Sequence, residues 1–247
     1  MNLTRRILPT ALLVGVFAAP ASEARAGGAP EGARAAYARV LSRHVKDGRV
    51  DYAGLAKRSR ADLDTYLKAV AEASLPEDRN ARIGFLVDAY NALVLAAVLD
   101  HGRPRSVLDV KGFFDTETHR VAQKTVTLDQ LEKKILNPYA KDPRTHFVLV
   151  CAAVSCPILE AKPFAGTDLD ARMERAARRY LASGFGAQVR DGTLFISKIF
   201  DWYADDFGGA EGAASFARAR LPDKKRAALP ERPPVQFLDY NWTLNQR

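Results

Sequence analysis

The chain has few cysteines and few long apolar runs, and both absences narrow its class. Only two of its 247 residues are cysteine, too few for a disulfide scaffold or a self-contained zinc finger. After the first residues, we expect no stretch long and apolar enough to span a bilayer. Internal repeats and low-complexity linkers are also missing. With 47% hydrophobic and 27% charged residues, the composition is that of an ordinary globular protein.

Nucleotide and esterase motifs are missing too. The chain has no glycine-rich phosphate loop and no Gly-x-Ser-x-Gly elbow, so kinase, nucleotide-binding and serine-esterase functions lack support. Its net charge of +8 is too small an excess to indicate nucleic-acid binding, and we predict no nucleic-acid partner. Asp201 and Asp205 form a poor metal site because no histidine lies near them at ligand spacing. We therefore predict no metal and no cofactor.

Residues 1–26 have the pattern of a signal peptide. Arg5 and Arg6 precede an uncharged, mostly apolar run over residues 7–19, and Ala24-Arg25-Ala26 supplies the small-x-small cleavage pattern. The run is shorter than the ~20 residues of a membrane span, which disfavours the alternative of an uncleaved anchor. Cleavage after Ala21 is a second alternative, and the arginine pair only weakly indicates twin-arginine export. No cysteine near the cut supports lipoprotein anchoring.

Export would change the properties of the mature chain. Without residues 1–26 it has 221 residues and a net charge of +6. We expect it to be periplasmic or secreted, with no stable membrane span after cleavage, in a compartment where disulfides persist. The sequence identifies no partner; a component of the cell envelope is one option.

Hydrophobic periodicity predicts one α+β domain. The segment 76–99 is apolar on nearly all sides, so we expect it to form a buried central helix. Surrounding helices and a small antiparallel sheet complete the prediction. Hairpins are expected over 120–127, turning at Gln123-Lys124, and over 188–197, turning at Asp191-Gly192. The other helices are expected at 37–44, 61–71, 128–136, 169–181 and 212–220. The apolar run 147–154 fits a buried strand or a buried helix turn.

The predicted domain has three parts after the signal peptide. Residues 27–75 form a helical lead-in, 76–186 the core, and 187–247 a C-terminal hairpin and helix that complete the same domain. The composition has no shift that would mark a second domain.

Several local motifs resemble the domain-of-unknown-function family 547. They are Gly48–Tyr52, Phe85–Leu93, His146–Cys151, Ser155–Pro157, Ser197–Tyr203, Asp205–Phe207 and Asp239–Trp242. They cover most of the mature chain in the right order. Asp88 stands where the family usually has asparagine, and Asn241 where it usually has aspartate. The resemblance implies a fold but no activity.

Cys151 and Cys156 are the main candidates for chemistry. Three interpretations are open: a disulfide, which the exported setting favours; two buried thiols acting as small apolar residues; and a thiol nucleophile with His146 as base. Five residues span ~16 Å in a strand, and disulfide Cα atoms lie about 4.4–6.8 Å apart. A bridge, or a contact between His146 and Cys151, therefore requires a turn.

Asn91 and a later cluster are further candidates. Asn91 shares a face with apolar residues, so its amide is expected to be buried; we favour a structural amide that bonds a neighbouring loop over one that orients a catalytic group. Asp201, Trp202 and Tyr203 fit a helix start with aromatic anchors, and also an aromatic cleft for a sugar or peptide. Tyr90 is a further ligand-binding candidate.

Two functional hypotheses remain, and the sequence does not decide whether the protein is an enzyme. The favoured one is a non-catalytic envelope or binding module in which the two cysteines stabilise the fold. The alternative is a cysteine-dependent hydrolase or acyltransferase that uses Cys151 or Cys156 with His146 and Asn91 nearby.

Overall fold

The computed structural model describes residues 27–164 and 168–247. The predicted signal peptide, 1–26, lies outside the described residues. The fold is α+β, as predicted, with helices around one long buried helix and three small sheets of order β1-β2, β3-β4 and β5-β6-β7.

The N-terminal part is a helical layer. Its helices are α2 (Glu31–His44), α3 (Tyr52–Arg58) and α4 (Arg60–Glu72), and the short strands β1 (Val45–Lys46) and β2 (Arg49–Val50) connect α2 to α3. Both residues of the turn between the strands, Asp47 and Gly48, have positive φ, as this tight hairpin requires. Helices α2 and α4 pack together, and Tyr37 stacks on Tyr66 with ring centroids 4.4 Å apart.

Helix α5 (Arg79–Asp100) is the predicted central helix. Asp78 caps it by accepting a hydrogen bond from the backbone N–H of Ala81, so the helix begins three residues after the predicted start. Every residue from Ile83 to Val98 is buried. By length and composition α5 is long and apolar enough to cross a membrane, which corrects the expectation that no later stretch qualifies. Since 89% of its most apolar window is buried inside the protein, α5 has the surroundings of a core helix.

A hairpin and a run of short helices follow α5. The helix η1 (Val107–Asp109) precedes β3 (Thr118–Val121) and β4 (Lys124–Thr127). The turn between the strands is Ala122-Gln123, both with positive φ, one residue earlier than predicted. A capping box of Thr127 and Gln130 starts the next segment, which comprises α6 (Leu128–Gln130), the π-helix η2 (Leu131–Leu136) and α7 (Asn137–Ala140).

The apolar run 147–154 is neither a strand nor a regular helix. The short helix η3 (Pro143–Phe147) ends at its beginning, and residues 148–157, here called the thiol loop, are irregular. The loop is nevertheless mostly buried, so its apolar residues pack without regular structure. Periodicity fails here because the backbone pairs with side chains and other loops rather than with a ladder.

The C-terminal part contains a second layer. Helix α8 (Leu169–Ala182) leads to β5 (Ala187–Arg190) and β6 (Thr193–Ile196), whose turn is Asp191-Gly192, as predicted. Strand β7 (Val235–Phe237) pairs parallel to β6, so this sheet is mixed rather than purely antiparallel. Between β6 and β7 lie the helices α9 (Ile199–Trp202), α10 (Ala204–Phe207), α11 (Gly209–Arg220) and α12 (Asp223–Ala227).

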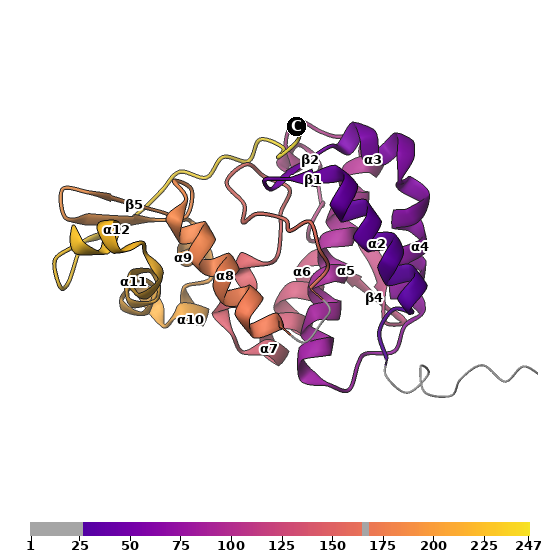
Figure 1. The fold of residues 1–247 in the computed structure, drawn as a ribbon, viewed down its shortest axis with the longest axis horizontal. Helices are drawn as coiled ribbons and strands as arrows, with labels where there is room; N and C mark the ends of the chain where they lie inside the picture. Colours follow the sequence, from indigo (N-terminus) through magenta and orange to yellow (C-terminus); the bar gives the residue numbers. More distant parts are fainter. Residues whose placement is uncertain (1–26, 165–167) are drawn as a thin grey trace, which may run out of the picture.

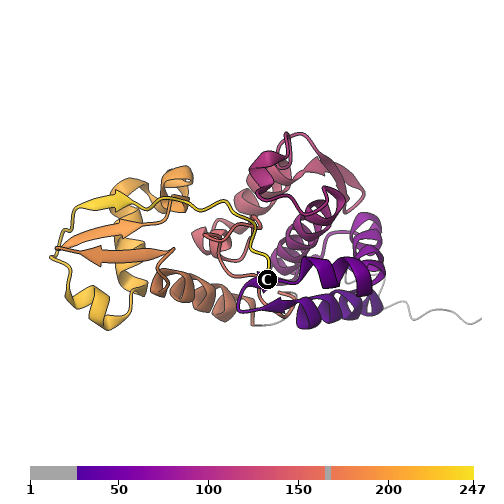
Figure 2. The ribbon, with the colours of Figure 1, turned by 90° about the horizontal axis from the view of Figure 1, so that it is seen from above.

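The C-terminal segment ties the two ends of the molecule together. The helical layer around α5 and the sheet with β5 lie at opposite ends, with α8 between them (Figure 1). Residues 238–247, here called the C-terminal strap, run back from the sheet to the hairpin β1-β2 (Figure 2). There the backbone N–H of Val50 donates to Asn245, and that of Arg247 donates to Val50, both at 3.0 Å. The strap thereby crosses the thiol loop.

Candidate functional site

A cleft of about 510 Å³ lies where α5, the thiol loop, α9 and the strap meet. Its volume is in the range of small-molecule sites. Both cysteines and His146 line it, together with loop 107–115 and part of η2. Its aromatic lining includes Tyr90, Phe113, Phe114, Tyr203, Tyr240 and Trp242. Charged groups are few and of both signs: Lys111, Asp115, Asp129, Glu132 and Lys133.

Asn91 holds the thiol loop against α5. Its Nδ2 donates to the carbonyl of Val148 at 2.9 Å, and its Oδ1 accepts from the backbone N–H of Val150 at 3.0 Å. Asn91 is buried and is absent from the lining of the cleft. The geometry therefore supports the structural interpretation of this amide. Because Asn91 bonds the backbone just before Cys151, it is a positioning residue.

The thiol loop turns sharply between the two cysteines, as any contact between them requires. Ala152 has a φ of 59°, a left-handed conformation that costs a residue with a Cβ about 1 kcal/mol. The backbone N–H of Cys156 donates to the carbonyl of Ala153. The N–H of Cys151 in turn donates to Sγ of Cys156 at 2.7 Å. Both cysteines are free thiols in this structure.

The two thiols have opposite pKa shifts. Burial alone would raise the pKa of Cys156, but hydrogen bonds from the side chain and backbone N–H of Cys151 outweigh it and lower that pKa. Burial, followed by the neighbouring Cys156, raises the pKa of Cys151. The hydrogen bond from the N–H of Cys151 thus favours a thiolate on Cys156.

The strap holds the turn and adds an aromatic hydroxyl to it. The N–H of Asn245 donates to the carbonyl of Ala152 at 2.9 Å, and the N–H of Val154 donates to Thr243 at 2.8 Å. Oη of Tyr240 lies 3.1 Å from Sγ of Cys151. Burial raises the pKa of Tyr240, so its phenol stays protonated at neutral pH and can donate to sulfur.

Three aromatic rings form a platform beside the cysteines. The ring centroids of Trp202 and Tyr240 are 4.8 Å apart, those of Tyr240 and Trp242 are 4.8 Å apart, and those of Trp202 and Trp242 are 5.6 Å apart. Trp202, with 47% of its surface exposed, is among the few large apolar side chains left open to solvent. These three residues, here called the ring platform, present an apolar surface to anything that enters the cleft.

His146 lies in the cleft wall, but both of its ring nitrogens face carboxylates. Its Nε2 is 2.8 Å from Oδ2 of Asp206, and its Nδ1 is 3.7 Å from Oε1 of Glu132. Its ring packs at a tilt against that of Tyr203, with centroids 3.9 Å apart. In the described part of the chain, no hydrogen bond joins His146 to either thiol. The dyad required for a His146-assisted thiol nucleophile is therefore not assembled.

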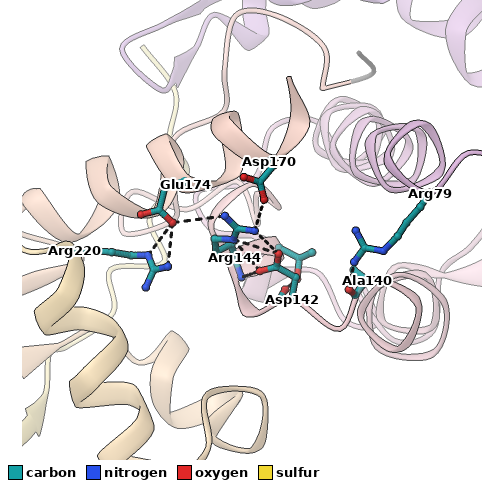
Figure 3. A network of polar contacts seen from close by, with 8 residues as sticks. Arg79, Ala140, Asp142, Arg144, Asp170, Glu174 and Arg220 are labelled. Carbon is teal, nitrogen blue, oxygen red and sulfur yellow. Dashed lines mark hydrogen bonds and ion pairs between the residues drawn. The ribbon is translucent and has the colours of Figure 1, made fainter. Parts of the chain in front are cut away.

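An ion-pair network fixes the short helix that carries His146 (Figure 3). Arg144 bonds Asp142 at 2.7 Å and Asp170 at 2.6 Å. On α8, Glu174 is 3.6 Å from Arg144 and 3.0 Å from Arg220 of α11. Burial raises the pKa of Asp142, but the bonds from Arg144 lower it further than burial raises it. Helices α8 and α11 thus anchor η3, and with it His146.

The other sequence candidates divide into two groups. Tyr90, Trp202 and Tyr203 line the cleft with the cysteines. Asp201 instead pairs with Lys198 at 3.0 Å and lines a neighbouring cavity. Within residues 27–164 and 168–247, no group of three or more His, Cys, Asp or Glu side chains is arranged to hold a metal ion.

Two further polar side chains from the motifs have backbone partners. Asp88 accepts a hydrogen bond from the N–H of Phe164 at 2.7 Å, and the side chain of Asn241 accepts one from the N–H of Thr243 at 2.9 Å. Each of these side chains therefore contributes to loop structure. On α8, Arg172 and Arg179 both form ion pairs with Glu160.

Sequence reasoning missed the partners supplied by distant segments. Tyr240, Trp242 and Asp206 lie within motifs that carry the family resemblance, so a signal for them was present without an assigned role. Glu132 and the loop 107–115 had no such signal. The π-helix η2 places Glu132 beside His146, and π-helical turns recur at functional sites.

A comparison with models of known families agrees with the three motifs that lie between residues 75 and 181, which are Phe85–Leu93, His146–Cys151 and Ser155–Pro157. The sequence model of the family "Protein of unknown function, DUF547" matches residues 75–181. Residues 75–181 are a DUF547 domain. The domain contains α5, η3, the thiol loop and nearly all of α8, whereas the ring platform lies beyond its end. No match was found among curated proteins or solved structures.

The DUF547 domain and the segments after it thus combine two chemical features in one cleft. One is a pair of thiols under an aromatic hydroxyl, and the other is an apolar ring surface flanked by carboxylates. The first suits thiol chemistry and the second suits binding of a ring-bearing ligand.

Proposed function

We propose that the protein is an exported, non-catalytic binding module whose cleft takes a sugar. The ring platform carries this proposal, because the exposed ring of Trp202, held by the tilted rings of Tyr240 and Trp242, offers an apolar face to a ligand. The C–H face of a pyranose stacks on such rings, and its hydroxyls then need nearby hydrogen-bond partners.

The rest of the cleft fits the same ligand class. Asp115 and Glu132 supply oxygens that accept hydrogen bonds from hydroxyls, and Lys111 supplies donors. Leu149 and Ile199 give the inner wall an apolar character that suits an acetamido methyl group. An N-acetylhexosamine oligomer therefore matches both the platform and the wall. Such sugars occur in cell envelopes, in keeping with the proposed periplasmic or secreted location.

The binding proposal is tested with a tetramer of N-acetylglucosamine. We expect calorimetric heat and a change in tryptophan fluorescence on titration into the native protein. We also expect about 5- to 30-fold weaker binding for Trp202→Ala, because a stacked ring contributes about 1–2 kcal/mol. Phe237→Ala is the matched control, since Phe237 is 39% exposed and lies on β7, outside the cleft lining. Equal loss in both variants, or no heat with the native protein, would sink the proposal.

The cysteine-dependent hydrolase remains the second candidate, and the lowered pKa of Cys156 favours it. Its weakness is the general base, because His146 is paired with Asp206 and the group that contacts Cys151 is the protonated phenol of Tyr240. Release of p-nitrophenol from p-nitrophenyl acetate, lost in Cys156→Ser and retained in Phe237→Ala, would favour the hydrolase over the binding module.

A further inference from the structure

The thiol loop brings its two cysteines close together, and the proposed sugar binding gives these cysteines no role. Five residues in an extended strand would span ~16 Å, yet Sγ of Cys156 lies 2.7 Å from the backbone nitrogen of Cys151. The hydroxyl of Tyr240, 3.1 Å from Sγ of Cys151, contacts the other thiol. Both line the cleft, so a small molecule can reach the pair.

We propose that Cys151 and Cys156 form a thiol–disulfide exchange site that reacts with small organic or peptide disulfides entering the cleft. Three observations carry this inference. The turn places Sγ of Cys156 against the backbone N–H of Cys151, both cysteines face a cleft large enough for a small disulfide, and bonds from outside the thiol loop hold its turn closed. This site goes beyond the proposed sugar binding and does not require it.

The surroundings of each thiol assign its role. Cys156 receives hydrogen bonds from the N–H and the side chain of Cys151, which lower its pKa and stabilise its thiolate; the thiolate is the attacking species in exchange. Cys151 has a raised pKa, so it stays protonated until a mixed disulfide has formed. Cys156 is therefore the nucleophile and Cys151 the resolving thiol.

The exchange proceeds in two balanced steps. First, the Cys156 thiolate attacks one sulfur of the substrate RS–SR; its S–S bond breaks, RS⁻ leaves and takes a proton, and Cys156 is joined to the other RS group. Second, Cys151 loses its proton to water and attacks Sγ of Cys156, expelling the second RS⁻. The two cysteines are oxidised to one disulfide, and the substrate is reduced to two thiols.

The strap makes this pair a preorganised one. Ala152 is held at a φ of 59° by the bond from Asn245, and strained backbone of this kind persists where its surroundings enforce it. Oxidation also removes the thiol partner of Tyr240. Because Tyr240 contacts both tryptophans of the ring platform, formation of the disulfide is expected to change their fluorescence.

The test uses the reduced native protein and oxidised glutathione as the probe disulfide at neutral pH. Free thiols are then blocked by alkylation, and the intact mass is measured with time. We expect the native protein to lose both free thiols and to carry no glutathione, because Cys151 resolves the mixed disulfide. Cys151→Ser, whose hydroxyl can still donate to Cys156, is expected to retain one bound glutathione. Cys156→Ser is expected to react at least about tenfold more slowly.

Each outcome decides something. A native protein that keeps both thiols, or that carries two glutathiones without an internal disulfide, overturns the exchange site. If Cys156→Ser reacts as fast as Cys151→Ser, Cys156 is not the nucleophile. Circular dichroism checks that both variants fold, and the native result still decides if one does not. Sugar titration is measured separately by calorimetry, so heat without disulfide formation, or the reverse, shows which proposal has failed.

Discussion

Two buried histidines in this protein have similar partners and different positions. His44, at the corner of α2, α3 and α4, has Nε2 2.9 Å from Oγ of Ser59 and Nδ1 3.6 Å from Asp51. His146, in the cleft wall, has Nε2 2.8 Å from Asp206 and Nδ1 3.7 Å from Glu132. In both rings Nδ1 is buried without a hydrogen bond.

The first of these regions has the residue types of a hydrolytic triad and lacks its access. Ser59, His44 and Asp51 follow the order of nucleophile, base and orienting acid. His44 and Ser59, however, are only 1% and 2% exposed and are absent from the cleft lining. His146 lines the cleft but has carboxylates where a nucleophile would be. Residue types at short distances therefore indicate chemistry only where a substrate can reach them.

We expect the strongest effect from Asn91→Ala, which removes the side chain that holds the thiol loop against α5 and leaves the corner around His44 untouched. The variant leaves the carbonyl of Val148 and the N–H of Val150 without their partners, so we expect a loss of about 2–4 kcal/mol in the free energy of unfolding. Urea denaturation measures it. Asn80→Ala, at an exposed position of the same helix, is the control and should change stability by less than about 0.5 kcal/mol.

Reactivity of the thiols gives the same variant a second readout. If the amide positions the thiol loop, the folded Asn91→Ala variant should also form the Cys151–Cys156 disulfide more slowly with oxidised glutathione. Unchanged stability together with an unchanged rate would show that the thiol loop does not depend on Asn91.

A smaller effect is expected from Ser59→Ala. This variant tests whether Ser59, His44 and Asp51, at the buried corner of α2, α3 and α4, have a purely structural role. The variant leaves Nε2 of His44 buried without a partner, at a cost of about 1–2 kcal/mol in the free energy of unfolding. Ser42→Ala, at an exposed position of α2, is the matched control. Any hydrolysis of p-nitrophenyl acetate should persist in Ser59→Ala. Its loss in a folded variant would show that Ser59, His44 and Asp51 are catalytic despite their burial.

The sequence predicted the long elements of this fold well because their signals are local. Helix α5 is apolar on nearly all sides, and the turn Asp191-Gly192 has the residues that a two-residue hairpin needs. The thiol loop could not be predicted, because the side chain of Asn91 and the strap hold its backbone, and neither is near it in the chain. A run of apolar residues indicates burial but not the shape of the backbone.

The candidate site followed the same rule. Cys151, Cys156 and His146 were found from their residue types and their place in the family motifs, and all three line the cleft. Their partners were not found: Tyr240 is 89 residues from Cys151, and Asp206 is 60 residues from His146. Contacts across such distances depend on the packing of α8 and the path of the strap, which no local pattern encodes.

The weakest effect that we expect is a pH dependence of stability caused by the buried side chain of His44. Burial lowers the pKa of His44 despite the opposing influence of Asp51, with Arg58 and Arg247 lowering it further. Below the ordinary histidine pKa of about 6.5, the unfolded chain therefore binds protons first, so stability is full above that pH and is lost as the pH falls. We expect a lower melting temperature at pH 5 than at pH 7, with a smaller difference in His44→Gln, whose amide can still reach Ser59.

Burial also lowers the pKa of His119, so His119→Gln is the matched variant and should remove a separate part of the pH dependence of the melting temperature. Asp51 acts outside this range, because its lowered pKa withdraws stability only below about pH 4. If His44→Gln keeps the full difference between pH 5 and pH 7, His44 does not titrate in this way.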